Sequence, residues 1–335
     1  MKQIRTGGWL LVAVMLLSQG GCTFNQMVKR QYQKAKNTTR GEYYLETRAY
    51  RKGITVFTQE VARNPREPWA NHYLGRYYLA DDNDSMGLRY LTAASDLAPQ
   101  NADFQFWAGV AHFANGNRQR ERDAYRRVLA IDPDHPQALS YMGHNRLSAG
   151  KHLDALGYYR RCLAVWPTNP QALFNRALIL KKLSRDPEAY QAWLAYLQQY
   201  PTGAFARKAV QHLISAGHFD YRNYRIGGRR ITLDRIAFVP LTAELTPSAR
   251  KTLARLGDIF RRQDGNRTLQ ILVYQQNNIR LAAQRADSIR TCLLARMPDI
   301  APRRVRSSWF GVPETIRVGK KKFREGASVN FFTTR

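Results

Sequence analysis

The sequence predicts a multidomain protein with two folded parts: an all-α solenoid of five helical pairs plus a capping helix, then an α+β sandwich. Three observations predict this. Five prolines recur at one constant interval, and this spacing stops after Gly217. The last third of the chain then mixes short apolar runs, typical of strands, with two amphipathic helical stretches. The length of 335 residues fits about two domains.

The N-terminus has the pattern of an export signal. Lys2 and Arg5 precede an apolar run over residues 9–17, which is too short to span a bilayer. The small residues before Cys22 resemble the bacterial lipobox, in which the cysteine thiol is lipidated and the cysteine becomes the new N-terminus after cleavage. Gln19 departs from that pattern, because an aliphatic residue is expected there. Ordinary signal cleavage and an uncleaved anchor therefore stay open as alternatives.

The lipobox resemblance implies a lipoprotein signal peptide over residues 1–21, lipidation at Cys22 and a polar, basic tether over residues 22–33. Each buried acyl methylene contributes ~0.8 kcal/mol, so several chains on one cysteine hold a protein stably on a membrane. The residue after Cys22 is Thr23 and not Asp. By resemblance to the sorting rules of bacterial lipoproteins, this favours the outer membrane. We therefore expect a periplasm-facing protein on the outer membrane of a Gram-negative bacterium.

The prolines define the organisation of residues 34–203. A period of 34 residues with a proline near the end of each unit resembles the tetratricopeptide repeat (TPR), in which each unit is a pair of antiparallel helices. The prolines are Pro65, Pro99, Pro133, Pro167 and Pro201, and the units they predict are 34–67, 68–101, 102–135, 136–169 and 170–203.

Small residues recur where the two helices of a TPR unit cross closely. The first such position holds Gly41, Gly75, Gly109, Gly143 and Ala177, and the second holds Gly53, Gly87, Glu121, Ala155 and Ala189. Glu121 is the exception.

The amphipathic stretch over residues 204–216 fits a capping helix, so the solenoid is predicted to cover residues 34–218.

In the TPR family the first helix of each pair lines a concave groove. The corresponding side chains are aromatic and basic, which suits an extended peptide or a helix of a partner protein. We therefore expect a groove for envelope proteins, and the alternative is that Phe106 and Phe174 pack against adjacent helices. The predicted groove residues are Trp69, His72, Arg76, Phe106, His144, Phe174 and Lys181.

After a predicted linker over residues 219–230, the pattern over residues 231–335 is mixed. Strands are expected at 236–238, 269–274, 305–309 and 328–332, and helices at 245–262 and 280–296. The order is β-α-β-α-β-β, with the helices on one face of a sheet.

This order and one motif resemble the OmpA-like peptidoglycan-binding domain. The motif is Asn278-x-x-Leu281-Ala282-x-x-Arg285-Ala286-x-x-Ile289. The resemblance implies that Arg285 holds a carboxylate of diaminopimelate in the wall stem peptide, for which a planar guanidinium is well shaped. Asn278 would add hydrogen bonds beside it.

The same comparison shows a departure. Family members have a Gly-His-Thr-Asp loop before this helix, and its Asp pairs with the ligand ammonium. Here Gln275 and Gln276 lead directly into Asn277, so neutral amides replace the carboxylate. Peptidoglycan binding through these glutamines, Asn278 and Arg285 is therefore expected to be weak, or the domain has been repurposed to contact protein.

Composition limits the remaining functions. The formal charge is +28, from 53 basic and 25 acidic residues, and residues 221–335 carry 24 and 8 of these. Such a surplus implies anionic lipids, acidic glycans or nucleic acid as neighbours, or a solvated basic surface; an exported chain disfavours nucleic acid. The seven histidines are scattered, no phosphate loop follows a strand, and three cysteines make no disulfide framework. We expect no metal, no cofactor and no enzymatic activity.

Together these features predict an outer-membrane lipoprotein adaptor. It would contact peptidoglycan through its OmpA-like domain and scaffold protein partners through a TPR groove, in a trans-envelope assembly such as a secretion or pilus system. The alternative is a pure protein–protein scaffold whose OmpA-like domain does not bind peptidoglycan.

Overall fold

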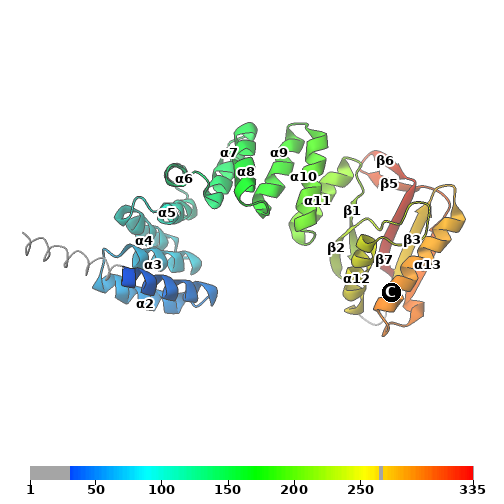
Figure 1. The fold of residues 1–335 in the computed structure, drawn as a ribbon, viewed down its shortest axis with the longest axis horizontal. Helices are drawn as coiled ribbons and strands as arrows, with labels where there is room; N and C mark the ends of the chain where they lie inside the picture. The colour runs from blue at the N-terminus through cyan, green and yellow to red at the C-terminus, as the bar shows by residue number, and fades with distance from the viewer. Residues whose placement is uncertain (1–30, 264–266, 335) are drawn as a thin grey trace, which may run out of the picture. The chain divides into compact units, whose positions relative to one another are not determined.

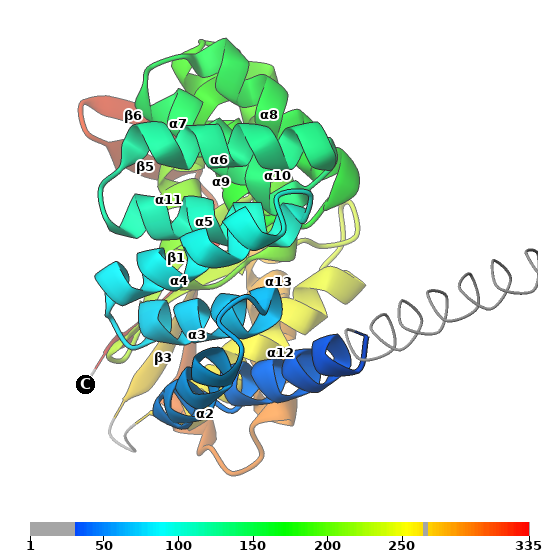
Figure 2. The ribbon, with the colours of Figure 1, turned by 90° about the vertical axis from the view of Figure 1, so that its left-hand side faces the viewer.

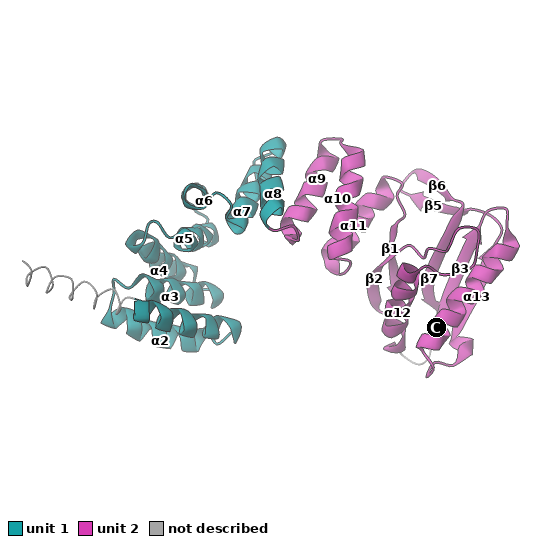
Figure 3. Ribbon diagram, viewed as in Figure 1, with its two compact units in different colours: residues 1–165 teal, residues 166–335 magenta. Residues whose placement is uncertain are grey.

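The computed structural model describes residues 31–263 and 267–334 (Figure 1). The predicted signal peptide, Cys22 and most of the predicted tether lie outside these residues. The chain divides into two compact units, Met1–Val165 and Trp166–Arg335, coloured separately in Figure 3. Each unit is described by itself.

Paired helices make up the described part of the first unit. Residues 31–46 are helical, so the last residues of the predicted tether already belong to a helix. The following helices are α2 (Tyr50–Arg63), α3 (Pro68–Ala80), α4 (Asp84–Leu97), α5 (Ala102–Ala114), α6 (Arg118–Ile131), α7 (Pro136–Ser148) and α8 (His152–Val165). Figure 2 shows α2, α3, α4 and α5 stacked in chain order, each in contact with the next.

The second unit begins with three more helices of the solenoid. They are α9 (Pro170–Lys182), α10 (Asp186–Gln199) and α11 (Gly203–Ser215). The first two form a further pair, and α11 packs against α10 at the place predicted for the capping helix.

The repeat period is confirmed in the helix boundaries. The helices α3, α5, α7 and α9 begin at Pro68, Ala102, Pro136 and Pro170, which are the first residues of the predicted units. The residue before each start accepts a hydrogen bond from the backbone N–H three positions on, which satisfies an otherwise unpaired donor of the first turn. These capping residues are Glu67, Asn101, His135 and Asn169.

Close helix crossings explain the small residues of the repeat. A Cβ atom added to Gly75 would lie 2.6 Å from Leu91 Cγ and 2.9 Å from the Leu91 backbone nitrogen. Because a backbone atom cannot move aside cheaply, α3 and α4 pack at this distance only with glycine here. The prediction of small residues at the crossing is confirmed at this position.

Glu121 breaks that rule and is accommodated by polar partners. Its side chain is buried, and one carboxylate oxygen lies 3.2 Å from Arg118 Nη1 on the same helix. The other oxygen accepts a hydrogen bond of 3.1 Å from Asn145 Nδ2 on α7. The exception therefore adds a buried, charged contact to the apolar packing between α6 and α7.

The second unit ends in a small α+β region. Its central sheet has the order β4-β3-β7, in which β4 is parallel and β7 antiparallel to β3. Helix α13 packs against β3 and β4, and Figure 1 shows it beside β3. The elements are β1 (Tyr221–Ile226), β2 (Arg229–Asp234), α12 (Pro247–Arg261), β3 (Thr268–Gln275), α13 (Ile279–Arg296), the 3₁₀ helix η1 (Pro302–Arg304), β4 (Val305–Phe310), β5 (Glu314–Val318), β6 (Lys321–Glu325) and β7 (Ala327–Thr334).

One apolar core holds these elements together. It is built from one face of each helix and from alternate residues of the sheet, as expected for a half-covered sheet. On β3, Leu269, Ile271 and Val273 point into the core, whereas the residues between them are only partly buried. The principal helix residues are Leu253, Leu256, Phe260, Ile289 and Leu293.

Two expectations for this region are corrected, and one hairpin was not expected. Residues 219–230 are not a linker, because β1 and the start of β2 form an antiparallel hairpin there. Residues 236–238 form no strand, and Phe238 makes only an isolated bridge to Leu245. The sequence did not predict a further hairpin, β5–β6. The other predicted strands and both helices are present.

The capping helix packs onto the first hairpin. Asn223 Nδ2 on β1 donates a hydrogen bond of 3.0 Å to the carbonyl oxygen of Arg207 on α11. On α10, the Tyr190 hydroxyl lies 3.2 Å from an Asp220 carboxylate oxygen, and its ring stacks on His218 with centroids 4.1 Å apart. The end of the solenoid and the α+β region therefore form one packed body.

Within the described ranges, no helix combines the length and the apolar character needed to cross a bilayer.

Candidate functional site

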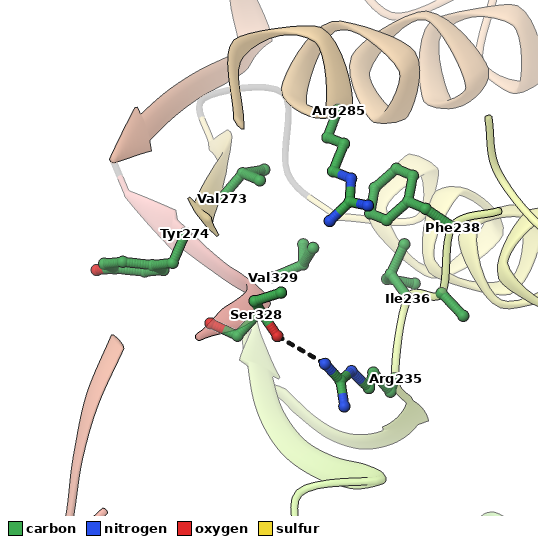
Figure 4. A pocket seen from close by; sticks show the side chains of 10 residues that line it. Arg235, Ile236, Phe238, Val273, Tyr274, Arg285, Ser328 and Val329 are labelled. Carbon is green, nitrogen blue, oxygen red and sulfur yellow. Dashed lines mark hydrogen bonds between the residues drawn. The ribbon is translucent and has the colours of Figure 1, made fainter. Parts of the chain in front are cut away.

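Arg285 lies at the centre of a pocket in the α+β region. The pocket has a volume of about 340 Å³ and lies between α13, the ends of β3 and β7, and the segment after β2. Figure 4 shows the Arg285 guanidinium reaching from α13 towards the ring of Phe238, with Val329 of β7 beyond it. The guanidinium carbon lies 4.5 Å from the centroid of the Phe238 ring.

Two hydrogen bonds fix the orientation of this guanidinium. Arg285 Nε donates to the carbonyl oxygen of Thr242 at 2.9 Å, and Nη1 donates to Gln275 Oε1 at 2.6 Å. The residue is 9% exposed. Burial, followed by the positive charge of Arg235, holds the pKa of Arg285 below its usual value. The side chain is therefore pre-oriented by neutral oxygen atoms alone.

The charge of Arg285 is not neutralised. Among residues 31–263 and 267–334, no carboxylate lies within ion-pair distance of it. A second arginine, Arg235, lines the same pocket, where its Nη2 donates to the Ala327 carbonyl oxygen at 2.8 Å. Its other nitrogen is 4.0 Å from Glu325, at the limit of an ion pair. The described lining residues include both arginines and no acid, so the pocket attracts an anion.

Of the other residues predicted for this site, one contacts Arg285 and two do not line the pocket. Gln275 supports Arg285 directly, as described. Asn278 accepts a hydrogen bond of 2.9 Å from the Leu281 backbone N–H and so caps the start of α13. The exposed Gln276 contacts Gly326 through its backbone N–H, at 2.7 Å from the carbonyl oxygen. Neither Asn278 nor Gln276 is among the residues that line the pocket.

Sequence reasoning missed three contributors to this pocket. Phe238, Thr242 and Arg235 all come from the segment between β2 and α12, which is separated from Arg285 by a helix and a strand. An aromatic residue followed by a Pro-containing loop gives no local sign of such a contact. The signal available was the charge pattern: Arg235 is a basic residue beside an apolar run that was expected to be a strand.

Four of the predicted groove residues of the first unit, Trp69, His72, Arg76 and Phe106, belong to one aromatic and charged cluster. Arg76 lies over the Trp107 ring, 4.3 Å from its centroid, and its Nη1 is 3.4 Å from Glu42 Oε1. Trp69 is partly buried against Phe104, with ring centroids 4.8 Å apart. His144 is exposed on α7. Arg76 and Trp69 thus remain partly accessible to a partner.

Buried residues correct part of the groove prediction. His72 is 2% exposed, and burial lowers the pKa of its imidazole to about 3. Phe106 is 7% exposed and packs against Tyr125 and Tyr141. In the second unit, Phe174 is 9% exposed and packs on Trp193 and Tyr196, while Lys181 pairs with Asp186 at 2.9 Å. The two phenylalanines serve helix packing, which was the alternative interpretation.

No set of three His, Cys, Asp or Glu side chains in the described part of the chain is placed to hold a metal ion.

Comparison with known proteins identifies the repeats. The family model for the tetratricopeptide repeat matches residues 87–136 and 142–204. Within those segments the chain is thus built of TPR units, and the helical pairs before them have the same spacing.

One solved structure shares the fold of the helical part, and a second is similar over a shorter stretch. PilF of Pseudomonas aeruginosa is 14% identical, with a TM-score of 0.52, over 56% of this chain and 86% of that one. MamA is 19% identical, with a TM-score of 0.43, over 48% of this chain and 93% of that one. At these identities the likeness concerns fold alone. The comparison with curated proteins finds no match.

Proposed function

We propose that this protein is a non-catalytic scaffold of the bacterial envelope, in which the TPR solenoid binds protein partners and the C-terminal region binds a carboxylate of the peptidoglycan stem peptide. TPR units are protein-interaction modules, and this supports the first half. The uncompensated charge of Arg285 carries the second half, because a buried cation without a carboxylate is costly unless a ligand supplies one.

The sheet topology supports the OmpA-like assignment. The succession α12-β3-α13-β4-β7, with β4 parallel and β7 antiparallel to β3, corresponds to the last five of the six expected elements, whereas the first expected strand is absent. The motif helix α13 presents Arg285 towards the pocket, as that resemblance implies. The missing loop Asp leaves no described acid in the pocket to receive an ammonium group. We therefore propose recognition of a carboxylate and not of a zwitterion.

Sedimentation with purified sacculi tests this half. The full chain should co-sediment, and Arg285→Ala should reduce retention by roughly tenfold or more, since a charge-assisted hydrogen bond contributes ~1.5–3 kcal/mol. Arg280→Ala removes an exposed arginine from the same helix and is the matched control. Sacculi whose stem carboxylates have been amidated should retain the wild-type chain as weakly as untreated sacculi retain the Arg285→Ala variant.

Equal retention of wild type and Arg285→Ala would contradict the proposed carboxylate site. No retention of either, together with a protein partner that co-purifies from native membranes, would favour the alternative of a scaffold whose α+β region contacts protein. Substitution Arg76→Ala in that purification tests the solenoid half, because Arg76 is a partly accessible cation of the aromatic cluster.

Membrane attachment through Cys22 and an outer-membrane location belong to the same proposal. Their support is the sequence pattern before Cys22. Fatty-acid labelling of the wild type and of Cys22→Ser in cells checks the anchor, and label retained by Cys22→Ser would contradict it. Participation in a secretion or pilus assembly would follow from the identity of the co-purifying partner.

A further inference from the structure

The β5–β6 hairpin carries a strongly basic outer face. In its register, Thr315 lies opposite Arg324 and Arg317 lies opposite Lys322. Because side chains alternate between the faces of a strand, these four share one face, and all four are exposed. The exposed residues Lys320 and Lys321 extend the same charge around the turn. Among residues 31–263 and 267–334, no acid forms an ion pair with any of these five basic residues.

The inner face of the hairpin takes up both of its acids. Glu314 lies 2.8 Å from Arg222 Nη1 and also accepts a hydrogen bond from Asn330 Nδ2 at 2.7 Å. Glu325 faces Arg235 at 4.0 Å. Phe323 packs on Phe219, with ring centroids 5.6 Å apart. The hairpin is therefore held against the body of the unit by one face, and only the basic face is left outward.

This arrangement has an electrostatic cost. Like charges directly opposite each other on paired strands destabilise the pair, and Arg317 and Lys322 are placed in that way. Nothing in the described fold offsets the repulsion. An external anion bound across the two strands would do so.

Exposed apolar side chains come immediately before the hairpin. Trp309 is 45% exposed, Phe310 38% and Val312 57%. Exposed aromatic and aliphatic residues beside a cluster of Lys and Arg are the combination found where proteins meet the head-group region of a membrane. A surface for single-stranded nucleic acid would instead need aromatic rings within the basic face for base stacking, and the four residues of this face include none.

We propose that the β5–β6 hairpin and the segment before it bind an anionic lipid surface, with the basic face on the lipid phosphates and Trp309, Phe310 and Val312 in the interfacial layer. The site is separate from the carboxylate pocket in its residues and does not depend on the proposed peptidoglycan contact.

Vesicle flotation with the full chain tests the proposal. Vesicles of phosphatidylcholine with phosphatidylglycerol are compared with vesicles of phosphatidylcholine alone, so that any contribution of the apolar N-terminus is common to both. Replacing Arg317, Lys322 and Arg324 together by Gln should weaken binding to the anionic vesicles by roughly 100-fold. High salt should weaken wild-type binding in the same direction.

Matched substitutions separate position from net charge. Lys52→Gln, Lys151→Gln and Arg160→Gln together remove the same charge from exposed positions of the first unit and should leave binding nearly unchanged. The hairpin variant should melt at or above the wild-type temperature, because it relieves the Arg317–Lys322 repulsion. Val312→Ser should weaken binding severalfold without changing its salt dependence.

Three results would overturn the proposal. The hairpin variant and the charge-matched control could bind anionic vesicles equally. Soluble glycerol phosphate could displace the chain from vesicles, which would indicate a site for a free phosphate. Duplex DNA could bind as tightly as the vesicles at the same salt concentration and lose binding in the hairpin variant, which would indicate a general polyanion surface. The Arg285→Ala variant should bind vesicles as the wild type does in each of these experiments.

Discussion

At the scale of single residues, the repeat depends on glycines at positions where two helices cross closely. Gly75 permits α3 and α4 to approach so closely that a methyl group would meet the backbone of Leu91. Gly157 on α8 is the opposite case, since it is exposed and an added Cβ would meet nothing within 4 Å. Of these two helical glycines in the same solenoid, Gly75 is required by a close helix crossing and Gly157 is not.

These two positions should respond to alanine in opposite directions. Gly75→Ala should lower the free energy of unfolding by about 1–3 kcal/mol through overpacking. Gly157→Ala should raise it by about 0.5–1 kcal/mol, because alanine loses less backbone freedom in a helix. Urea denaturation of both variants measures the difference, and a Gly75→Ala protein as stable as wild type would contradict the close crossing.

His72 gives a pH dependence whose sign follows from its burial. Its pKa is lowered from 6.5 to about 3, so between these values the unfolded chain binds more protons than the folded one. The stability that depends on neutral His72 is fully present above about pH 6.5. As the pH falls towards 3, the free energy of unfolding decreases by up to about 1.4 kcal/mol per pH unit. His72→Gln should flatten this slope, as measured by denaturation at several pH values.

At the scale of elements, the boundaries of the solenoid helices could be predicted from the sequence and those of the α+β region only in part. Prolines and small residues at fixed spacing are local signals, so each solenoid unit is visible alone. The β5–β6 hairpin escaped prediction because its outer positions are charged and its short strands show no apolar run. The β1–β2 hairpin did carry a signal, Gly227-Gly228 between two strands, but the same residues are also typical of a linker.

The pocket shows the same limit more sharply. Arg285 is predicted from a motif within its own helix, whereas Phe238 and Thr242 reach it through tertiary packing. The direction of a loop relative to a helix is set by the core beneath both, and no spacing within either segment encodes it. The groove prediction was wrong for His72, Phe106 and Phe174 for a related reason. Position in a repeat predicts which way a residue faces, but not how much of it a neighbouring helix covers.

Glu121 offers an element-scale prediction about the contact between α6 and α7. Asn145→Ala should cost about 1–3 kcal/mol of unfolding free energy, because it leaves a buried carboxylate oxygen without its donor. In a Glu121→Ala background the same substitution should cost much less. A double-mutant cycle by chemical denaturation measures this coupling, and additive effects would show that the hydrogen bond carries no stability.

At the scale of the whole molecule, the last TPR helices belong with the α+β region. Hydrogen bonds from Asn223 to Arg207 and from Tyr190 to Asp220 join them, and the contact boundary falls at Val165, not at the end of the repeats. The repeat pattern therefore predicts the right helices, whereas tertiary packing divides the chain at a different point.

Truncation tests this division. A chain that begins at Trp166 should unfold cooperatively, and one that begins at Phe219 should be less stable by about 2 kcal/mol or more, since it lacks both hydrogen bonds at ~1 kcal/mol each. A chain that begins at Gly203 retains α11 but not Tyr190 and should be intermediate. Equal melting of all three would mean that the α+β region is independent of the solenoid.

The contact between α11 and the first hairpin has a mechanical consequence. If a tensile load is applied at β7, it passes to β1 and its turn through the hydrogen bonds that Tyr224 and Gly227 make with Val329 and Thr333. From β1 it continues into α11 through the side chain of Asn223, without an intervening swivel. Whatever holds the C-terminal region thus also restrains α11, the helix that closes the solenoid.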